Sequence, residues 1–215
     1  MYLSRVLLDI TNRNTMRALA FPNKFHGAIE SCFRDDRKRK LWRLDKLGDE
    51  IYVIILSEEK PDLSLFCAQF SPSGSIWESK NYMPFLESLE NDTIWRFRLT
   101  SCPTICFPSK TKEEANTDKR ERGKVRPHLT IEHQKQWLIN RSEKHGFKLF
   151  SNGFDIVQSK LQHFYKRDRH NITLSSVTYE GVLSITDVEA FRKSLIDGIG
   201  RGKAYGMGLM TIMHI

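Results

Sequence analysis

Stretches of apolar and polar residues along the chain predict a mixture of strands and helices. Residues 2–8 are mostly apolar, as in a central strand, whereas the apolar residues between Phe25 and Phe33 recur at the spacing of one helix face. Two short apolar runs on either side of Gly48 and Asp49 predict a hairpin. The first half is therefore predicted to form a strand, a helix, two hairpin strands and two short helices, at residues 2–8, 25–33, 41–44, 51–56, 62–69 and 84–89.

The second half repeats this theme. Its pattern predicts a strand, a helix, two strands and a final strand at residues 93–100, 131–145, 154–164, 171–183 and 205–213. A capping box formed by Thr186 and Glu189 begins a further helix, which ends before Gly198. Each half then approximates a βαββαβ unit. We predict an α+β fold of two tandem ferredoxin-like domains, residues 1–91 and 92–215, with a ligand-binding cleft between them.

Charge is distributed unevenly along the chain. The 215 residues carry 34 Lys+Arg and 26 Asp+Glu, a net charge of +8, of which residues 1–107 contribute +1 and residues 108–215 contribute +7. This asymmetry indicates a surface for a polyanion, the alternative being a protein kept in solution by a basic loop. Residues 108–127 are dense in charge and contain two apolar residues, Ala115 and Val125, so we predict a flexible loop there.

A basic turn joins the two predicted strands at 154–164 and 171–183. It contains Lys166, Arg167 and Arg169, and Lys160 precedes it on the first of these strands. We expect these four side chains to contact the phosphates of duplex RNA, because an A-form helix hides its bases and is recognised by shape and backbone. An exposed loop with a solubilising charge is the alternative for each of them.

A glycine-rich segment lies between the last predicted helix and the last predicted strand. It contains five glycines in eleven residues, interspersed with two basic residues: Gly198, Gly200, Gly202, Gly206 and Gly208, with Arg201 and Lys203. Glycines permit close approach of the backbone, and their N–H groups can bind phosphate oxygens. The segment fits neither the P-loop nor the dinucleotide-binding pattern, and a turn needed for sheet geometry is the alternative.

The spacing Gly198-Ile199-Gly200-(five residues)-Gly206 resembles the segment before the last strand of CRISPR-associated repeat-RNA endoribonucleases. Further segments with fitting order and spacing are Met1–Val6, Phe25–Ile29 with His26, Leu41–Asp45, Trp95–Leu99, Gly123–Pro127 and Gln136–Leu138. Together they resemble the CasE family, the crRNA-processing subunit of the type I-E Cascade complex, over nearly the whole chain.

This resemblance implies an activity and binding partners for the protein. Members of the CasE family have two tandem ferredoxin-like domains, bind the hairpin of the CRISPR repeat transcript and cut at its 3′ base without a metal. They then remain attached to the product in Cascade. The implied partners are CRISPR repeat RNA and the other Cascade subunits, and Gly198, Gly200, Arg201, Gly202, Lys203 and Gly206 are expected to hold the RNA backbone.

His26 is the candidate general acid or base. RNA supplies its own nucleophile, the 2′-OH, and an imidazole can take that proton or give one to the leaving 5′-oxygen. In the family a Tyr often stands three residues before this His, whereas this chain has Asn23, which cannot give up a proton. Lys24 and Tyr205 are the remaining candidates for a second acid or base on chemical grounds alone.

Several classes of function are not expected. The longest apolar run, residues 51–56, is far shorter than the about 18 residues that a membrane span requires. The seven histidines and four cysteines show neither an HxxxH pair with a carboxylate nor a CxxC pair, so we predict no metal, no cofactor and reduced thiols in a cytoplasmic protein. The rival interpretations are a non-catalytic subunit that binds the repeat hairpin and an enzyme that holds a nucleotide cofactor on its glycine-rich segment.

Overall fold

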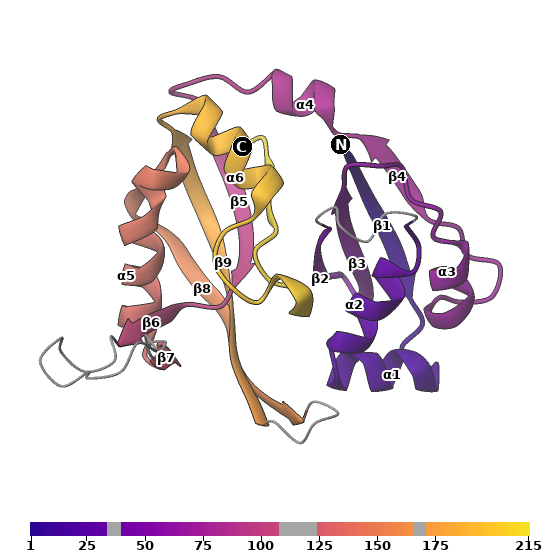
Figure 1. Ribbon diagram of the computed structural model, residues 1–215. Coiled ribbons are helices and arrows are strands. Elements are labelled where there is room, and N and C mark those ends of the chain that lie inside the picture. Colours follow the sequence, from indigo (N-terminus) through magenta and orange to yellow (C-terminus); the bar gives the residue numbers. More distant parts are fainter. Residues whose placement is uncertain (34–39, 108–123, 166–170) are drawn as a thin grey trace, which may run out of the picture.

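The computed structural model describes residues 1–33, 40–107, 124–165 and 171–215 (Figure 1). Its strands are β1 (Tyr2–Leu8), β2 (Leu41–Leu47), β3 (Glu50–Ser57), β4 (Glu78–Asn81), β5 (Ile94–Ser101), β6 (Thr104–Phe107), β7 (Lys124–Pro127), β8 (Phe147–Tyr165), β9 (Asn171–Ile185) and β10 (Met210–Met213). Its helices are α1 (Arg13–Ala20), α2 (Asn23–Glu30), α3 (Ser64–Phe70), α4 (Met83–Glu87), α5 (Ile131–Ser142) and α6 (Val188–Asp197), with the short 3₁₀ helices η1 (Glu143–His145) and η2 (Lys203–Tyr205). Within these described ranges, no helix is both long and apolar enough to cross a membrane.

Two four-stranded antiparallel sheets stand side by side and share one topology (Figure 1). The first sheet has the order β2-β3-β1-β4, and the second has the order β10-β5-β9-β8. In each sheet the strand that comes first in the sequence, β1 or β5, lies between the third and the fourth. The strand that comes second, β2 or β8, lies at an edge. This is the arrangement of the ferredoxin-like unit, so the predicted fold class is confirmed. The boundary between domains at residues 91 and 92 stays a prediction.

Local sequence patterns placed some elements correctly. The strand predicted over residues 2–8 is β1, and the predicted hairpin is formed by β2 and β3, which pair from Leu41 opposite Leu56 to Leu47 opposite Glu50. Gly48 has a φ of 62° in the turn between these two strands. The hairpin is therefore confirmed, together with the reason for a glycine at this position.

Other elements differ from the prediction. The last strand begins at Met210 rather than at residue 205, because residues 203–205 form η2 and the chain turns through Gly206 and Gly208 with positive φ. The capping box is wrong: the N-cap of α6 is Asp187, whose carboxylate accepts hydrogen bonds from the N–H groups of Glu189 and Ala190.

The structure also differs from the predicted loop at 108–127 and from the predicted strand at 154–164. The end of that loop, residues 124–127, is strand β7, and the remainder, 108–123, lies outside the described residues. β8 begins at Phe147, seven residues earlier than predicted, because a shift in register between Leu149 and Phe154 interrupts the alternation that marks a strand.

Two buried apolar clusters hold the fold together. One lies under the first sheet, where Phe25 of α2 packs against Trp42, Phe66 and Phe70 with ring centroids 5.1 to 6.0 Å apart. The other contains residues of both sheets, for example Leu41 and Leu56 of the first and Leu99 and Leu209 of the second half. Because a shared apolar core resists separation, the two sheets are joined by more than the connecting chain.

Candidate active site and nucleic-acid cleft

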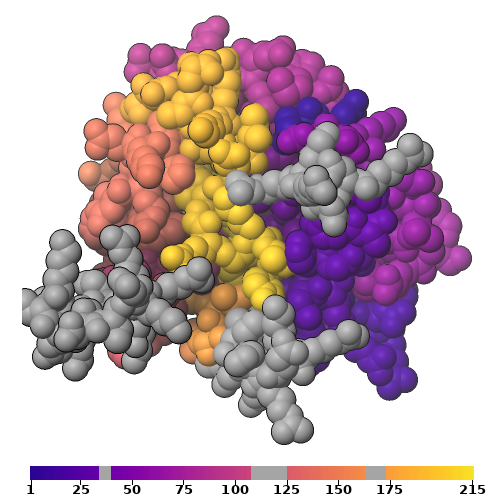
Figure 2. Space-filling view, in the orientation of Figure 1, coloured from indigo at the N-terminus to yellow at the C-terminus, as the bar shows by residue number. Residues whose placement is uncertain are grey.

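Helix α2 carries His26 and is fixed by two buried residues. Phe25 and Ile29 lie one turn apart and are fully buried in the core, so this face of the helix points inward. His26 lies beside that face, and its side chain is 36% exposed. α2 packs against η2, which belongs to the glycine-rich segment; in Figure 2 this C-terminal segment (yellow) lies directly against the first half of the chain. The tertiary structure thus brings the histidine to the segment that the sequence singled out.

The two ring nitrogens of His26 have different surroundings. Nδ1 is buried, has no hydrogen-bond partner among the described residues and lies 3.7 Å from Oε1 of Glu30. The exposed area of the side chain therefore comes from its other atoms. This leaves Nε2 as the nitrogen suited to meet a substrate.

Close packing explains the glycines at two positions of the segment. Gly206 has a φ of +79°, and a Cβ placed on it would lie 2.7 Å from the Trp42 ring. Gly200 has a φ of +89°, and a Cβ placed on it would collide with the Ser101 hydroxyl at 2.4 Å and lie in tight contact with the Trp137 ring at 3.0 Å. Any side chain at these positions would be strained and would also meet the protein's own core. The alternative of a turn required by sheet geometry thus has a direct structural basis.

The expected phosphate cradle of free N–H groups is not available at two of these glycines. The N–H of Gly198 donates to the Ser194 carbonyl at 2.9 Å, and that of Gly206 donates to the Lys203 carbonyl at 3.3 Å. These donors are used within the protein, because they cap α6 and close η2. RNA contact by Gly198, Gly200, Gly202 and Gly206 stays a prediction, and at Gly198 and Gly206 it needs atoms other than the N–H.

The two basic residues of the segment differ in solvent exposure and in the contacts of their side chains. The backbone of Arg201 forms an isolated bridge with that of Cys102, and its side chain is exposed to solvent. Lys203 donates from Nζ to the Asp197 carbonyl at 2.6 Å and is half-buried. Arg201 is thus the more accessible of the two cations, while Lys203 is held against the end of α6. Their contact with RNA stays a prediction.

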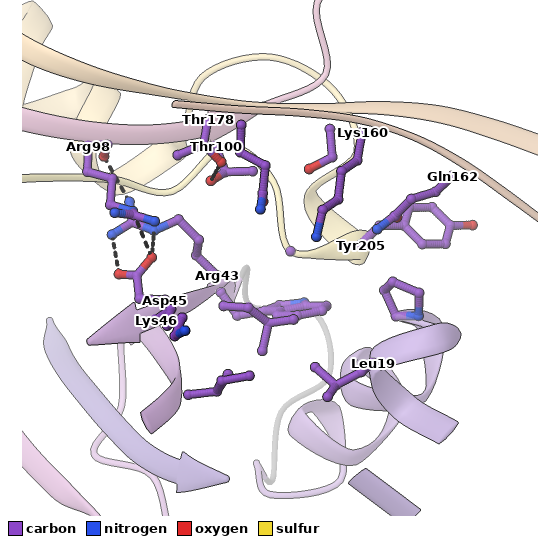
Figure 3. Close-up of a pocket in the computed structure, with 17 residues that line it drawn as sticks. Leu19, Arg43, Asp45, Lys46, Arg98, Thr100, Lys160, Gln162, Thr178 and Tyr205 are labelled. Atoms are coloured by element: carbon purple, nitrogen blue, oxygen red, sulfur yellow. Dashed lines mark hydrogen bonds and ion pairs between the residues drawn. The ribbon is translucent and has the colours of Figure 1, made fainter. Parts of the chain in front are cut away.

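A cleft of about 380 Å³ lies between the two sheets (Figure 3). Its lining includes four cationic, one anionic, two amide and one phenolic side chain: Arg43, Lys46, Arg98, Lys160, Asp45, Gln158, Gln162 and Tyr205. Neither Lys46 nor Lys160 has an ion-pair partner within the described part of the chain. In Figure 3, Lys160 and Gln162 extend from the second sheet toward Tyr205.

Two buried polar atoms of this cleft are unpaired. Nε1 of Trp42 and Oε1 of Gln162 have no hydrogen-bond partner among the residues that the structure describes. A buried polar group without a partner costs about 1–3 kcal/mol. Both atoms lie below the solvent-accessible surface, so the cations are the groups that the cleft presents to a ligand, and they suit an anionic one.

The candidate catalytic residues are only partly brought together. Tyr205 lines the cleft, and so does Pro22, which lies one turn before His26. Asn23 and Lys24 instead line another depression, which they share with Asn14, Arg17, Phe21, Gln69 and Phe70. The structure thus places Tyr205 on the cleft side of α2 and places Asn23 and Lys24 at a different surface. Their catalytic roles stay predictions.

The basic turn between β8 and β9 is described only in part. Lys160 is exposed on β8 and lines the cleft, as a role in RNA binding requires. Lys166, Arg167 and Arg169 lie outside the described residues. Lys160 thus lies at the cleft, and RNA contact by it and by the other three residues stays a prediction.

The sequence patterns did not reveal the buried charges below the cleft. Arg43 is 2% exposed and binds Asp45 through two hydrogen bonds of 2.7 and 2.6 Å. Asp45 also forms an ion pair with Arg98 of the second sheet, and Arg98 pairs with Glu180. The sequence does place Arg43 and Asp45 at alternate positions among the apolar residues of β2, but nothing local shows their partners in the second sheet.

The fold has two sheets of ferredoxin-like topology with a polar, cationic cleft between them. A partly exposed histidine, His26, lies on the helix beside it. These features define a candidate RNA-binding protein with a side chain suited to acid–base catalysis. The chain matches the family model described as CRISPR associated protein over residues 1–214. It therefore belongs to the family of CRISPR-associated proteins, and the resemblance drawn from its motifs is confirmed.

Individual relatives match along their full length. The CRISPR-associated endoribonuclease Cse3 of Thermus thermophilus is 28% identical over 227 residues, which cover 99% of both chains. Among solved structures, Thermus thermophilus Cse3 bound to an RNA representing a pre-cleavage complex has a TM-score of 0.76 at 23% identity, covering 99% of this chain and 98% of that one. Cas6e from Escherichia coli K-12 has a TM-score of 0.68 at 21% identity, covering 100% of both. These likenesses support the tandem fold.

Proposed function

We propose that the protein is a metal-independent endoribonuclease of the cytoplasm that binds the CRISPR repeat stem-loop and cleaves precursor crRNA at the 3′ base of the hairpin. It then remains with the product and the other Cascade subunits. The observation that carries this proposal is the position of His26, half-exposed on the helix that packs against η2 beside the inter-sheet cleft. The endoribonuclease Cse3, which matches the chain end to end, supports it, as does the structure of Cse3 bound to an RNA that represents a pre-cleavage complex.

The chemistry requires one proton to leave the ribose and another to reach the leaving group. Nε2 of neutral His26 takes the proton of the 2′-OH, and the 2′-oxygen attacks the adjacent phosphorus. The bond from phosphorus to the 5′-oxygen breaks, and the 5′-oxygen takes a proton from the imidazolium or from water. The products are a 2′,3′-cyclic phosphate and a 5′-hydroxyl, and all charges balance without a metal.

RNA binding draws on the cations of the cleft. Lys46 and Lys160 face the space between the sheets, and each can neutralise a phosphate and release its counterion. The excess positive charge of residues 108–215 supports the same surface.

A non-catalytic subunit that binds the crRNA hairpin is the second candidate. The observation that favours it is Asn23, which stands where a Tyr often stands in the CasE family and lines a depression separate from the cleft. Because Asn23 cannot transfer a proton, His26 has no second acid or base from this position for the cleavage reaction. A binding-only protein needs the cleft but not His26.

A cleavage assay separates the two candidates. A labelled repeat hairpin is incubated with the protein in EDTA, and we expect product from the wild type and none from His26→Ala. His133→Ala, which removes an exposed histidine on α5, is the matched control and should cleave normally. Absence of cleavage in EDTA that returns with magnesium would overturn metal independence, and equal cleavage by His26→Ala would overturn the role of this residue.

The nucleophile is tested separately. A single 2′-deoxy substitution at the cleavage site should abolish cutting and leave the dissociation constant unchanged, since the hydroxyl attacks its own phosphate. Cutting of the deoxy substrate would refute the internal nucleophile. Tight binding of the hairpin with no cleavage under any condition would favour the non-catalytic subunit.

A further inference from the structure

A partly buried ion pair, formed by Lys40 and Glu30, lies next to His26. The side chain of Lys40 is 2% exposed, and its Nζ lies 2.8 Å from Oε2 of Glu30 and 5.1 Å from the centre of the Phe33 ring. A buried ammonium is costly unless an anion compensates it. Lys40 therefore fixes one carboxylate oxygen of Glu30 in place, which limits where the other oxygen can point.

That other oxygen faces the histidine. Oε1 of Glu30 lies 3.7 Å from Nδ1 of His26, one helical turn away on α2. The distance is too long for a hydrogen bond, but Nδ1 is buried and has no other partner within the described residues. A small torsional change of either side chain closes the gap. Pairing the buried Nδ1 favours that change, since a buried polar atom without a partner is costly. Catalytic hydrogen bonds also often tighten when substrate binds.

We propose that Glu30 is the positioning residue for His26: it accepts the Nδ1–H, and Lys40 holds it there. This inference rests on the proposed function of His26 as the base. A proton on Nδ1 leaves the lone pair on Nε2, the nitrogen that must take the 2′-OH proton. The opposite tautomer would present an N–H to the substrate and could not accept that proton. The carboxylate also stabilises the imidazolium that forms, as the acidic member of a Ser-His-Asp triad does.

The proposal is tested first without RNA, by the tautomer of His26. Nitrogen-15 NMR of the wild-type protein should show the neutral ring mainly with its proton on Nδ1. In Glu30→Gln the Lys40 ammonium retains the amide oxygen, so the amide NH₂ turns toward Nδ1 and the Nε2–H form should predominate. Glu78→Gln removes the partner of the exposed Arg5 on β4 and is the matched control, with the wild-type tautomer. A wild-type ring protonated mainly on Nε2 would overturn the proposal.

Cleavage provides the second readout. Single-turnover cleavage by Glu30→Gln should fall at least about tenfold, within the range that general acid–base catalysis contributes, with the RNA dissociation constant unchanged within twofold. Because this variant leaves Lys40 buried without its carboxylate, a second variant, Glu30→Leu with Lys40→Met, removes both charges together and should lose the Nδ1–H preference and the rate alike. Wild-type rates in either variant would refute positioning, whereas an inactive wild type with an Nδ1–H ring would refute only the proposed function.

Discussion

The guanidinium of Arg43 and the carboxylate of Asp45 form a two-point ion pair on β2, below the cleft between the two sheets. Arg43 also donates to the backbone carbonyls of Arg98 and Leu209 at 2.8 and 2.9 Å, which belong to the second half of the chain. One buried side chain therefore links the two sheets, and Asp45 is the anion that compensates its charge.

Removal of that carboxylate should be costly. In Asp45→Ala the buried guanidinium of Arg43 keeps its charge without an anion, so we expect the free energy of unfolding to fall by about 3–5 kcal/mol. Urea denaturation measures this. The control is Glu78→Ala, which breaks the exposed pair with Arg5 and should cost at most about 1 kcal/mol. Equal losses in the two variants would contradict a buried, linking role for the Arg43–Asp45 pair.

A methyl group at Gly206 should destabilise the junction between the glycine-rich segment and Trp42. Gly206→Ala carries the left-handed backbone penalty of about 1–2 kcal/mol and also places its Cβ 2.7 Å from the indole ring. Gly74→Ala isolates the first effect, because Gly74 has nearly the same φ, +78°, and nothing lies within 4 Å of its Cβ. Thermal unfolding should show the larger loss for Gly206→Ala, and similar losses would show that the Trp42 contact is unimportant.

Stability should fall in mild acid through His145. Burial lowers the pKa of this ring, aided by the nearby Lys144, Arg141 and Lys203, and Nδ1 lies 2.7 Å from the Ser194 hydroxyl. The unfolded chain thus binds a proton more readily than the folded one. The contribution of His145 is complete above about pH 6.5, the ordinary value, and is lost as the pH falls through the lower folded pKa.

Urea denaturation between pH 5 and 8 measures this effect. This range includes the ordinary pKa of a histidine. Across it, the free energy of unfolding of His145→Gln should depend less on pH than that of the wild type. His214→Gln alters an exposed histidine near the C-terminus and serves as the control, with the wild-type profile. A His145→Gln profile that coincides with the wild type would show that this ring does not titrate differently on folding.

Lys160 should contribute a phosphate contact to RNA binding. Lys160→Ala is expected to weaken binding of the repeat hairpin about tenfold and to reduce the slope of log K against log salt by about 1. Lys148→Ala is the matched control, since Lys148 is also exposed on β8 but does not line the cleft. An unchanged salt slope in Lys160→Ala would remove this residue from the RNA surface.

The limits of local pattern are clearest in the elements that were not predicted. β4 is a short strand of four residues, Glu78–Asn81, without an apolar alternation, and its pairing with β1 through the backbone makes it a strand. α1 is a short, mostly polar helix capped by Asn12 and packed against α2 and α3. Their own sequences carry weak signals because tertiary contacts supply the stabilisation.

Local pattern along the chain was enough to predict the apolar strands and helices, the doubled βαββαβ order, the excess positive charge of residues 108–215 and the family motifs that contain His26 and the glycine-rich segment. It did not show which polar groups lie together in the folded chain. Lys40 pairs with Glu30 next to His26, and Arg43 donates to a carbonyl 166 residues away. Periodicity reports how neighbouring residues share a face, whereas the pairing of buried charges depends on how distant segments pack together.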